Sequence, residues 1–235
     1  MNPTMSQTTP DLVDIEALTI ADVLRHLHSG SLTSEALVRA YIERARAHPD
    51  LNIFITLDEE GALATARAVD AARRAGQPVG PLAGVPVVVK DNIHVAGLPS
   101  TSGTPALANF IPAEDAPVVQ KLRNAGAVIL GKTNMHELAF GATGYNAAYH
   151  VPGVIGVRNP YDPSRIAGGS SSGSAAALGA RMAPAALGTD TGGSMRIPPA
   201  LNGCSSLRPS ARRYPSLGIA PIASSRDTAG PMALC

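Results

Sequence analysis

Hydrophobic positions early in the chain repeat at the spacing of one helix face. Apolar side chains recur every three or four residues over 20–27, and Ser29 and Gly30 follow, which predicts an amphipathic helix that ends at the glycine. A second helix is predicted over residues 35–46, with either Thr33 or Ser34 as its N-cap, because apolar and charged residues alternate at the same period. These two helices are expected to pack together.

Short β-branched runs alternate with helical patterns in the next part of the chain. Residues 52–57 and 85–89 predict strands, and residues 59–75 predict an alanine-rich helix between them. A helix over 116–125 and a strand over 127–130 are predicted next. The 85–89 run is apolar throughout, which is typical of a strand buried on both faces. The alternation predicts an α/β fold with a largely parallel, mixed central sheet flanked by helices.

A long segment rich in glycine, proline, serine and asparagine follows over residues 141–173. Segments of this length without periodicity are uncommon inside a compact domain and are usually functional, so we expect this one to contribute to a site. Beyond it, residues 174–182 predict a helix of small residues and residues 185–187 a short strand. Residues 195–201 predict a helical turn that two consecutive prolines break.

The composition is that of a globular protein and excludes several classes of partner. Hydrophobic residues make up 45% of the 235 residues and charged residues 16%, and the formal net charge is +1. That balance provides no basic stripe for nucleic acid. No apolar run reaches about eighteen residues, and the start of the chain carries acidic residues instead of a basic leader. We therefore expect a cytoplasmic protein that binds neither nucleic acid nor a membrane.

Two serine clusters flanked by glycine are the first candidates for a site. Their sequences are GGSSSGS at residues 168–174 and GTDTGGS at residues 188–194. Glycine lets backbone N–H groups approach a ligand atom, and serine supplies a hydroxyl nucleophile or relay. A flexible linker or an anion-binding turn is the alternative interpretation of either cluster alone. Neither cluster matches a phosphate-binding loop.

A serine triad based on histidine is excluded for the residues present. Ser171 is central in a G-x-S-x-G pattern, but that arrangement needs a histidine later in the chain, and the last histidine is His150. None of the six histidines has the spacing of a metal site, and neither do Cys204 and Cys235. We therefore expect no metal site.

A serine nucleophile then needs another base, for which a buried lysine is the natural candidate. Of the three lysines, Lys121 is expected on a solvated helix face and Lys132 at a strand end, where it could hold a loop. Lys90 ends the apolar run 86–89, and burial there would lower its pKa toward neutrality. Lys90 is therefore the candidate base, and a purely structural ion pair between Lys90 and Asp91 is the alternative.

Four motifs together resemble the amidase signature family. In chain order they are KDN at residues 90–92, GGSS at 168–171, GTDTGGSMRIP at 188–198 and RDTAGPM at 226–232. The resemblance extends over nearly the whole chain from about Ile20 onward. Within the family, residues 158–167 and 213–215 are most similar to the indoleacetamide and mandelamide hydrolases.

The resemblance implies a role for each of these positions. Ser194 would be the nucleophile, Ser170 the bridging serine after a cis peptide bond from Gly169, and Lys90 the base. The oxyanion hole would be formed by the backbone N–H groups of Thr191, Gly192, Gly193 and Ser194. Together they would hydrolyse a small carboxamide, such as an arylacetamide, to carboxylate and ammonia through an acyl-serine intermediate. No metal or organic cofactor is implied.

The resemblance also implies that the chain is incomplete, because family members are much longer. We expect the N-terminal part of a single amidase domain, with a frayed segment over residues 1–18, a helical region over 19–76 and the catalytic core portion over 77–235. The acyl group of the substrate and the oligomeric state, including a homodimer, stay open. Two other interpretations are the A subunit of a tRNA-dependent amidotransferase, which passes ammonia to a partner, and an inactive fragment.

Overall fold

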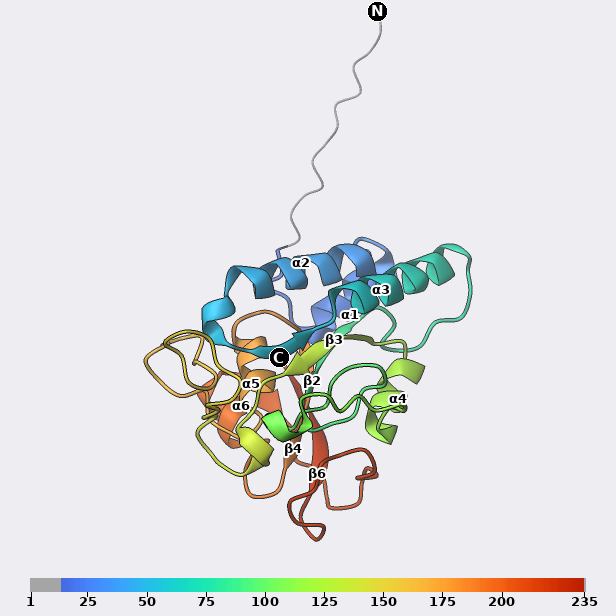
Figure 1. Cartoon of the computed structure of the whole chain (residues 1–235). Helices are drawn as coiled ribbons and strands as arrows, with labels where there is room; N and C mark the ends of the chain where they lie inside the picture. Colours follow the sequence, from blue (N-terminus) through green and yellow to red (C-terminus); the bar gives the residue numbers. More distant parts are fainter. Residues whose placement is uncertain (1–13, 235) are drawn as a thin grey trace, which may run out of the picture.

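Six strands form one mixed sheet in the computed structural model, which describes residues 14–234 (Figure 1). In chain order they are β1 Phe54–Leu57, β2 Pro86–Lys90, β3 Val128–Thr133, β4 Ala185–Asp190, β5 Ser205–Ser206 and β6 Thr228–Ala233. Their order across the sheet is β1-β3-β2-β4-β6-β5. The central strand β2 is parallel to β3 and to β4, whereas the other three pairs are antiparallel. The predicted α/β fold with a mixed sheet is confirmed, and parallel pairing is confined to the three central strands.

The α-helices among the described residues follow the predicted pattern closely. They are α1 Ile20–Ser29, α2 Ser34–Ala47, α3 Glu59–Arg74, α4 Pro117–Asn124, α5 Ser172–Gly179 and α6 Ile197–Leu201. Thr33 is the N-cap of α2, since its hydroxyl accepts a hydrogen bond from Ala36 N at 3.1 Å. Gly30 ends α1 with a φ of 72°, a left-handed conformation that suits glycine.

Two predicted helices near the serine clusters differ from the structure. α5 begins at Ser172, two residues before the expected start, so its first turn lies within the first serine cluster. The prolines Pro198 and Pro199 do not break α6, because they lie in its first turn. Backbone N–H groups there have no partner within a helix, so a proline costs nothing at that position.

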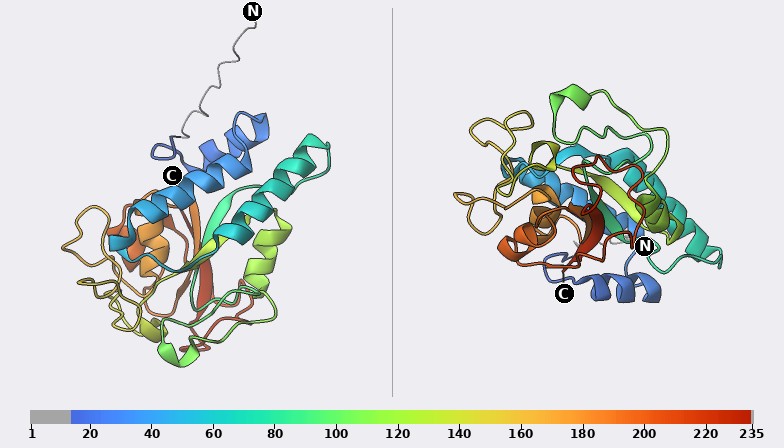
Figure 2. Two further views of the ribbon diagram at one scale, coloured as in Figure 1. Left: turned by 45° about the horizontal axis from the view of Figure 1, so that its top comes forward. Right: turned by 90° about the horizontal axis from the view of Figure 1, so that it is seen from below.

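The three N-terminal helices lie together at one side of the sheet (Figures 1 and 2). The buried carboxylate of Asp70 on α3 fixes the start of α2, because it accepts hydrogen bonds from Ser34 N at 2.8 Å and Glu35 N at 2.9 Å. Of the segment expected to be frayed, residues 1–13 lie outside the described residues, and Ile15 is buried in the core. None of the helices in residues 14–234 is long and apolar enough to cross a membrane.

The core centres on β2 and on α5, which packs against the middle of the sheet. Every residue of β2 is buried, and so are residues 172–178 of α5. Small side chains let this helix approach the backbone closely: a Cβ on Gly173 would lie 2.5 Å from Ile53 O. The close approach places the serine cluster at the start of α5 beside the ends of the central strands.

Candidate active site

Two parallel strands in the middle of the sheet end at the same edge and bring polar residues there. β2 ends at Lys90 and β4 ends at Asp190. Ligand sites of parallel sheets lie beyond the carboxyl ends of the strands, where the loops begin. The end of the long segment 141–173 reaches this edge, and so does the loop that carries Ser194.

Three side chains from these segments form one continuous hydrogen-bonded chain. Lys90 Nζ lies 2.7 Å from Ser170 Oγ, and Ser170 Oγ lies 2.8 Å from Ser194 Oγ. Lys90 and Ser170 are fully buried, whereas Ser194 is 9% exposed. The peptide bond between Gly169 and Ser170 is cis. The structure therefore brings together the three side chains that the sequence analysis selected, and only the last of them opens to solvent.

The position of Lys90 changes its protonation. Burial lowers the pKa of Lys90 to about 7, although the negative charges of Asp190 and Asp227 act to raise it. A lysine with this pKa is largely uncharged just above neutral pH. Its free lone pair can then accept the proton of a neighbouring hydroxyl group.

Asp91 does not pair with Lys90, so the structural alternative for that lysine was wrong. The partner of Asp91 is Lys132, whose Nζ lies 3.3 Å from Asp91 Oδ1 with both side chains fully buried. Lys132 also donates to Ser100 Oγ at 2.7 Å, and Thr101 N donates to Asp91 Oδ2 at 2.9 Å. The pair thus holds the loop that follows β2, which is the role expected for Lys132.

A buried carboxylate shapes the loop that carries Ser194. The side chain of Asp190 is completely inaccessible to solvent. Four donors reach it: the backbone N–H groups of Gly193 and Met195, each at 3.0 Å, and the guanidinium groups of Arg196 and Arg208, at 3.1 and 2.9 Å. Burial acts to raise the pKa of the Asp190 carboxyl, but the hydrogen bonds from Arg196, Met195 and Arg208 outweigh burial and keep that pKa below its usual range.

The four backbone N–H groups expected in an oxyanion hole are not equivalent. The N–H of Gly193 already donates to Asp190, so this group is committed to the shape of the loop. The N–H groups of Thr191, Gly192 and Ser194 have no hydrogen-bond acceptor within residues 14–234. All three residues line a cavity in front of the Ser194 hydroxyl. Three donors, and not four, are thus available to a ligand.

The cavity in front of Ser194 has a volume of about 340 Å³ and is mainly apolar. Phe140, Ile197 and Ile222 contribute its larger side chains, and Phe140 is 80% exposed. Among the described residues that line the cavity, none carries a charge. A ligand bound here would meet one hydroxyl group, free backbone donors and apolar walls.

Three residues beside the Lys90 chain had no assigned role in the sequence analysis. Thr189 Oγ1 accepts hydrogen bonds from Lys90 Nζ at 2.7 Å and from Asn92 Nδ2 at 3.1 Å, and Asp190 holds the loop. Asn92, Thr189 and Asp190 all lie within the quoted motifs, at or next to the ends of buried strands, so polar residues at those positions were the available signal. In residues 14–234, no group of three or more His, Cys, Asp or Glu side chains is placed to hold a metal ion.

The site lies at the carboxyl ends of the central strands of an α/β sheet, where a buried lysine is linked through one serine to a second serine. This arrangement defines a class of serine site in which lysine stands in place of histidine. The comparison with protein families agrees with this class. The family model described as Amidase matches residues 36–235, and the chain belongs to this family.

Individual relatives cover different activities within the family. The chain is 54% identical over 216 residues to mandelamide hydrolase from Pseudomonas putida, a match that spans 92% of the chain and 43% of that protein. It is 45% identical over 221 residues to the A subunit of a glutamyl-tRNA(Gln) amidotransferase from Acidothermus cellulolyticus, with 94% and 43% coverage. Among solved structures, the peptide amidase from Stenotrophomonas maltophilia matches with a TM-score of 0.87 and 40% identity, over 94% of the chain and 46% of that structure. The chain thus spans less than half the length of these relatives.

Proposed function

We propose that the protein hydrolyses a small uncharged carboxamide to a carboxylate and ammonia through an acyl-serine intermediate. The observation that carries this proposal is the hydrogen-bonded chain from Lys90 Nζ through Ser170 Oγ to Ser194 Oγ, which ends at an open cavity. Similarity to a mandelamide hydrolase and to a peptide amidase supports it.

Lys90 acts as the base in this proposal. Because burial lowers its pKa to about 7, a large fraction of the amine is uncharged at neutral pH. Hydroxyl hydrogens rotate freely, so Ser194 can donate to Ser170 while Ser170 donates to Lys90 across the 2.8 and 2.7 Å contacts. The proton of Ser194 moves to Ser170 as the proton of Ser170 moves to Lys90.

In the acylation step, the proton that Ser194 loses is returned to the leaving nitrogen. Ser194 Oγ forms a bond with the amide carbon, and the tetrahedral oxyanion is held by the free N–H groups of Thr191, Gly192 and Ser194. One such donor typically contributes about 3 kcal/mol of transition-state stabilisation. The C–N bond breaks, and the nitrogen leaves as ammonia after it takes the proton back from Lys90 through Ser170. Water then attacks the acyl-serine by the same route, releases the carboxylate and restores the Ser194 hydroxyl.

The acyl group of the proposed substrate is apolar and includes an aromatic ring, as in mandelamide or indoleacetamide. The cavity supports this choice, because its larger side chains are Phe140, Ile197 and Ile222 and no described lining residue carries a charge. A charged acyl group would lose its hydration there without a partner, which is unfavourable.

Ammonia release and serine labelling test the proposal. The protein is incubated with mandelamide, phenylacetamide and indoleacetamide, and with a fluorophosphonate probe that reacts with activated serines. Ammonia release and labelling at Ser194 are expected in the unmodified protein, and both are expected to be lost in Ser194→Ala and to fall at least a hundredfold in Lys90→Met. Folded protein that neither releases ammonia nor reacts with the probe would show that the site is inactive, as in the inactive-fragment interpretation.

The alternative function is that of the ammonia-releasing component of a tRNA-dependent amidotransferase. The 45% identity to one such protein supports it. In that case ammonia would pass to a partner protein, and the protein alone would not release ammonia from arylacetamides. Turnover of arylacetamides by the protein alone favours the hydrolase. The cytoplasmic location and the homodimer expected from the sequence stay predictions.

A further inference from the structure

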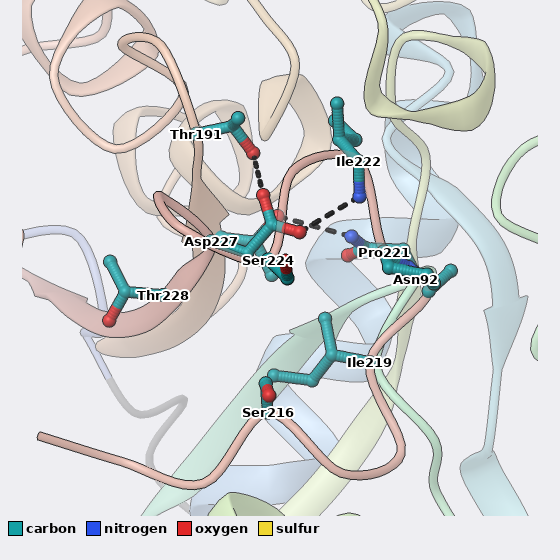
Figure 3. A pocket seen from close by; sticks show the side chains of 11 residues that line it. Asn92, Thr191, Ser216, Ile219, Pro221, Ile222, Ser224, Asp227 and Thr228 are labelled. Atoms are coloured by element: carbon teal, nitrogen blue, oxygen red, sulfur yellow. Dashed lines mark hydrogen bonds between the residues drawn. The ribbon is translucent and has the colours of Figure 1, made fainter. Parts of the chain in front are cut away.

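A second, smaller cavity is lined in part by Thr189, whose hydroxyl group contacts Lys90. Its volume is about 70 Å³, and it is lined by Asn92, Thr189, Thr191 and Asp227 together with residues of the 216–224 loop (Figure 3). A water molecule needs only about 10–15 Å³ of such space, so this cavity has room for water. Its lining combines polar side chains with the apolar residues Ile219, Pro221 and Ile222, so a water molecule could find hydrogen-bond partners on the polar part.

One of the residues that line this cavity carries an unpartnered polar atom. Asn92 is 2% exposed, and its Oδ1 has no hydrogen-bond partner among the residues that the structure describes. A buried carbonyl oxygen without a hydrogen-bond partner is energetically unfavourable. The cost disappears if a donor within the cavity reaches that oxygen atom.

Thr189 contributes a second unused group. Its Oγ1 accepts from Lys90 Nζ at 2.7 Å and from Asn92 Nδ2 at 3.1 Å, which occupies both acceptor positions of the hydroxyl. The hydrogen of the Thr189 hydroxyl has no acceptor among residues 14–234. Since Thr189 and Asn92 both line the cavity, a residue with an unused donor and a residue with an unused acceptor border the same small space.

We propose that this cavity binds a water molecule that accepts a hydrogen bond from Thr189 and donates one to Asn92, and that the three groups together position the Lys90 amine. An uncharged amine has two hydrogens and one lone pair. If the Thr189 hydroxyl donated to Lys90, it would occupy the lone pair and Lys90 could not accept the proton of Ser170. The water accepts the hydrogen bond of the Thr189 hydroxyl instead. Thr189 can then only accept a hydrogen bond from Lys90, and the lone pair of the Lys90 amine is left for Ser170.

Thr189 and Asn92 are thus positioning residues that act through Lys90, and this inference rests on the proposed role of Lys90 as the base. The ionisable groups near the amine are Asp190 at the end of β4, Asp227 before β6 and His136 after β3. None of them contacts Thr189 Oγ1 in the structure. A change at Thr189 therefore reports on its own hydrogen bond to Lys90.

Two measurements on three variants test the inference. Thr189→Val removes the hydroxyl at nearly constant volume, and Thr189→Ser keeps it. Thr133→Val is the matched control, because it removes a buried hydroxyl that bonds to Ser174 on the neighbouring helix. The first measurement is the side-chain titration of Lys90 by NMR with isotope-labelled lysine, which is tractable because the chain has only three lysines. The second is the rate of fluorophosphonate labelling at Ser194 as a function of pH.

Loss of the Thr189 hydroxyl removes an acceptor that favours the charged amine, so the titration midpoint of Lys90 should move to lower pH in Thr189→Val. The labelling rate on its high-pH plateau should fall at least tenfold, because the lone pair is no longer directed to Ser170. Thr189→Ser and Thr133→Val should both stay within about twofold of the unmodified rate, with an unchanged midpoint. A merely structural role would lower the folded fraction without moving the midpoint.

The water itself is tested by a crystal structure at high resolution. Density within hydrogen-bond distance of both Asn92 Oδ1 and Thr189 Oγ1 is expected, and its loss is expected in Asn92→Leu. A Thr189→Val protein with the midpoint and plateau of the unmodified protein, or a cavity without that density, overturns the inference. Unmodified protein that does not react with the probe but shows the NMR shift and the water contradicts only the proposed function.

Discussion

Lys90 and Asp91 are adjacent in the chain, yet their side chains belong to two separate hydrogen-bond networks. Lys90 Nζ contacts Ser170 and Thr189, whereas Asp91 pairs with Lys132 at 3.3 Å. Successive side chains in an extended chain point in opposite directions, which explains the separation. Of the two buried lysines, the one without a carboxylate partner has the pKa suited to a base.

Replacement of Lys90 should stabilise the fold while it removes reactivity. Its pKa is about 7 in the folded protein against 10.5 for a lysine in water, so the unfolded chain binds more protons between these pH values. The free energy of unfolding therefore rises with pH in this window, by up to about 1.4 kcal/mol per pH unit. In Lys90→Met this contribution is absent, and the variant should be more stable than the unmodified protein at pH 7 and below, by about 1–4 kcal/mol. Urea unfolding from pH 6 to 9.5 measures both curves, and parallel curves would contradict the buried, uncharged amine.

Loss of the other buried lysine should have the opposite effect. Lys132→Met leaves the carboxylate of Asp91 buried without its ion pair, and such a change typically costs about 3–5 kcal/mol. Lys121→Met on the exposed side of α4 is the control, with an expected change within about 0.5 kcal/mol. Thermal unfolding followed by circular dichroism compares the two variants. Equal melting temperatures would show that the buried pair does not hold the loop after β2.

Asp190→Asn should lower the reactivity of Ser194 without direct contact with its hydroxyl. The carboxylate holds the backbone of Gly193 and two arginine side chains, so its neutralisation leaves Arg196 and Arg208 without their ionic partner. We expect a loss of about 2–4 kcal/mol in stability and labelling of Ser194 that is at least tenfold slower. Asp162→Asn removes an exposed ion pair with Arg165 and should change neither quantity measurably. The urea midpoints and the labelling rates of both variants test this prediction, and equal values for the two variants would contradict it.

Two neighbouring glycines should respond differently to alanine. A Cβ at Gly192 meets nothing within 4 Å, so Gly192→Ala should keep its stability and reduce turnover of bulky amides, because the methyl group enters the cavity. Gly193 has a φ of 147°, and a Cβ there would lie 2.9 Å from Ile197 Cδ1. Gly193→Ala should therefore lose about 1–3 kcal/mol of stability. Melting temperatures and steady-state rates with amides of increasing size test both variants. Equal stability of Gly192→Ala and Gly193→Ala would contradict the prediction.

Elements with a clear local pattern could be predicted from the sequence, whereas those formed by long-range pairing could not. The apolar run that becomes β2 and the periodic residues of α2 determine their own structure. β6 has the sequence TAGPMA, in which glycine and proline disfavour a strand, yet it pairs with β4 along its whole length. Such pairing overrides intrinsic preference, and Pro231 is tolerated because it is exposed next to a two-residue edge strand.

The residues of the site likewise divide into those that the sequence could predict and those that depend on the folded structure. Elimination among residue types was enough to select Lys90, and the family motifs added Ser170 and Ser194, which lie 80 and 104 positions further along the chain. The contact between Thr189 and Lys90 could not be predicted, because it depends on the register between β2 and β4. The commitment of the Gly193 N–H to Asp190 likewise depends on the folded shape of the loop.

Ser170 lies between Lys90 and Ser194, and this position allows a proton to move in either direction along the hydrogen-bonded chain. An imidazole ring offers two nitrogen atoms on opposite sides, but a primary amine offers a single lone pair at the tip of a fixed chain. Lys90 is enclosed in the protein and cannot swing between the attacking oxygen and the departing nitrogen. Rotation about one C–O bond in Ser170 can reverse the direction of proton flow at almost no energetic cost, so in the proposed function this small side chain gives a stationary amine access to both acylation and deacylation.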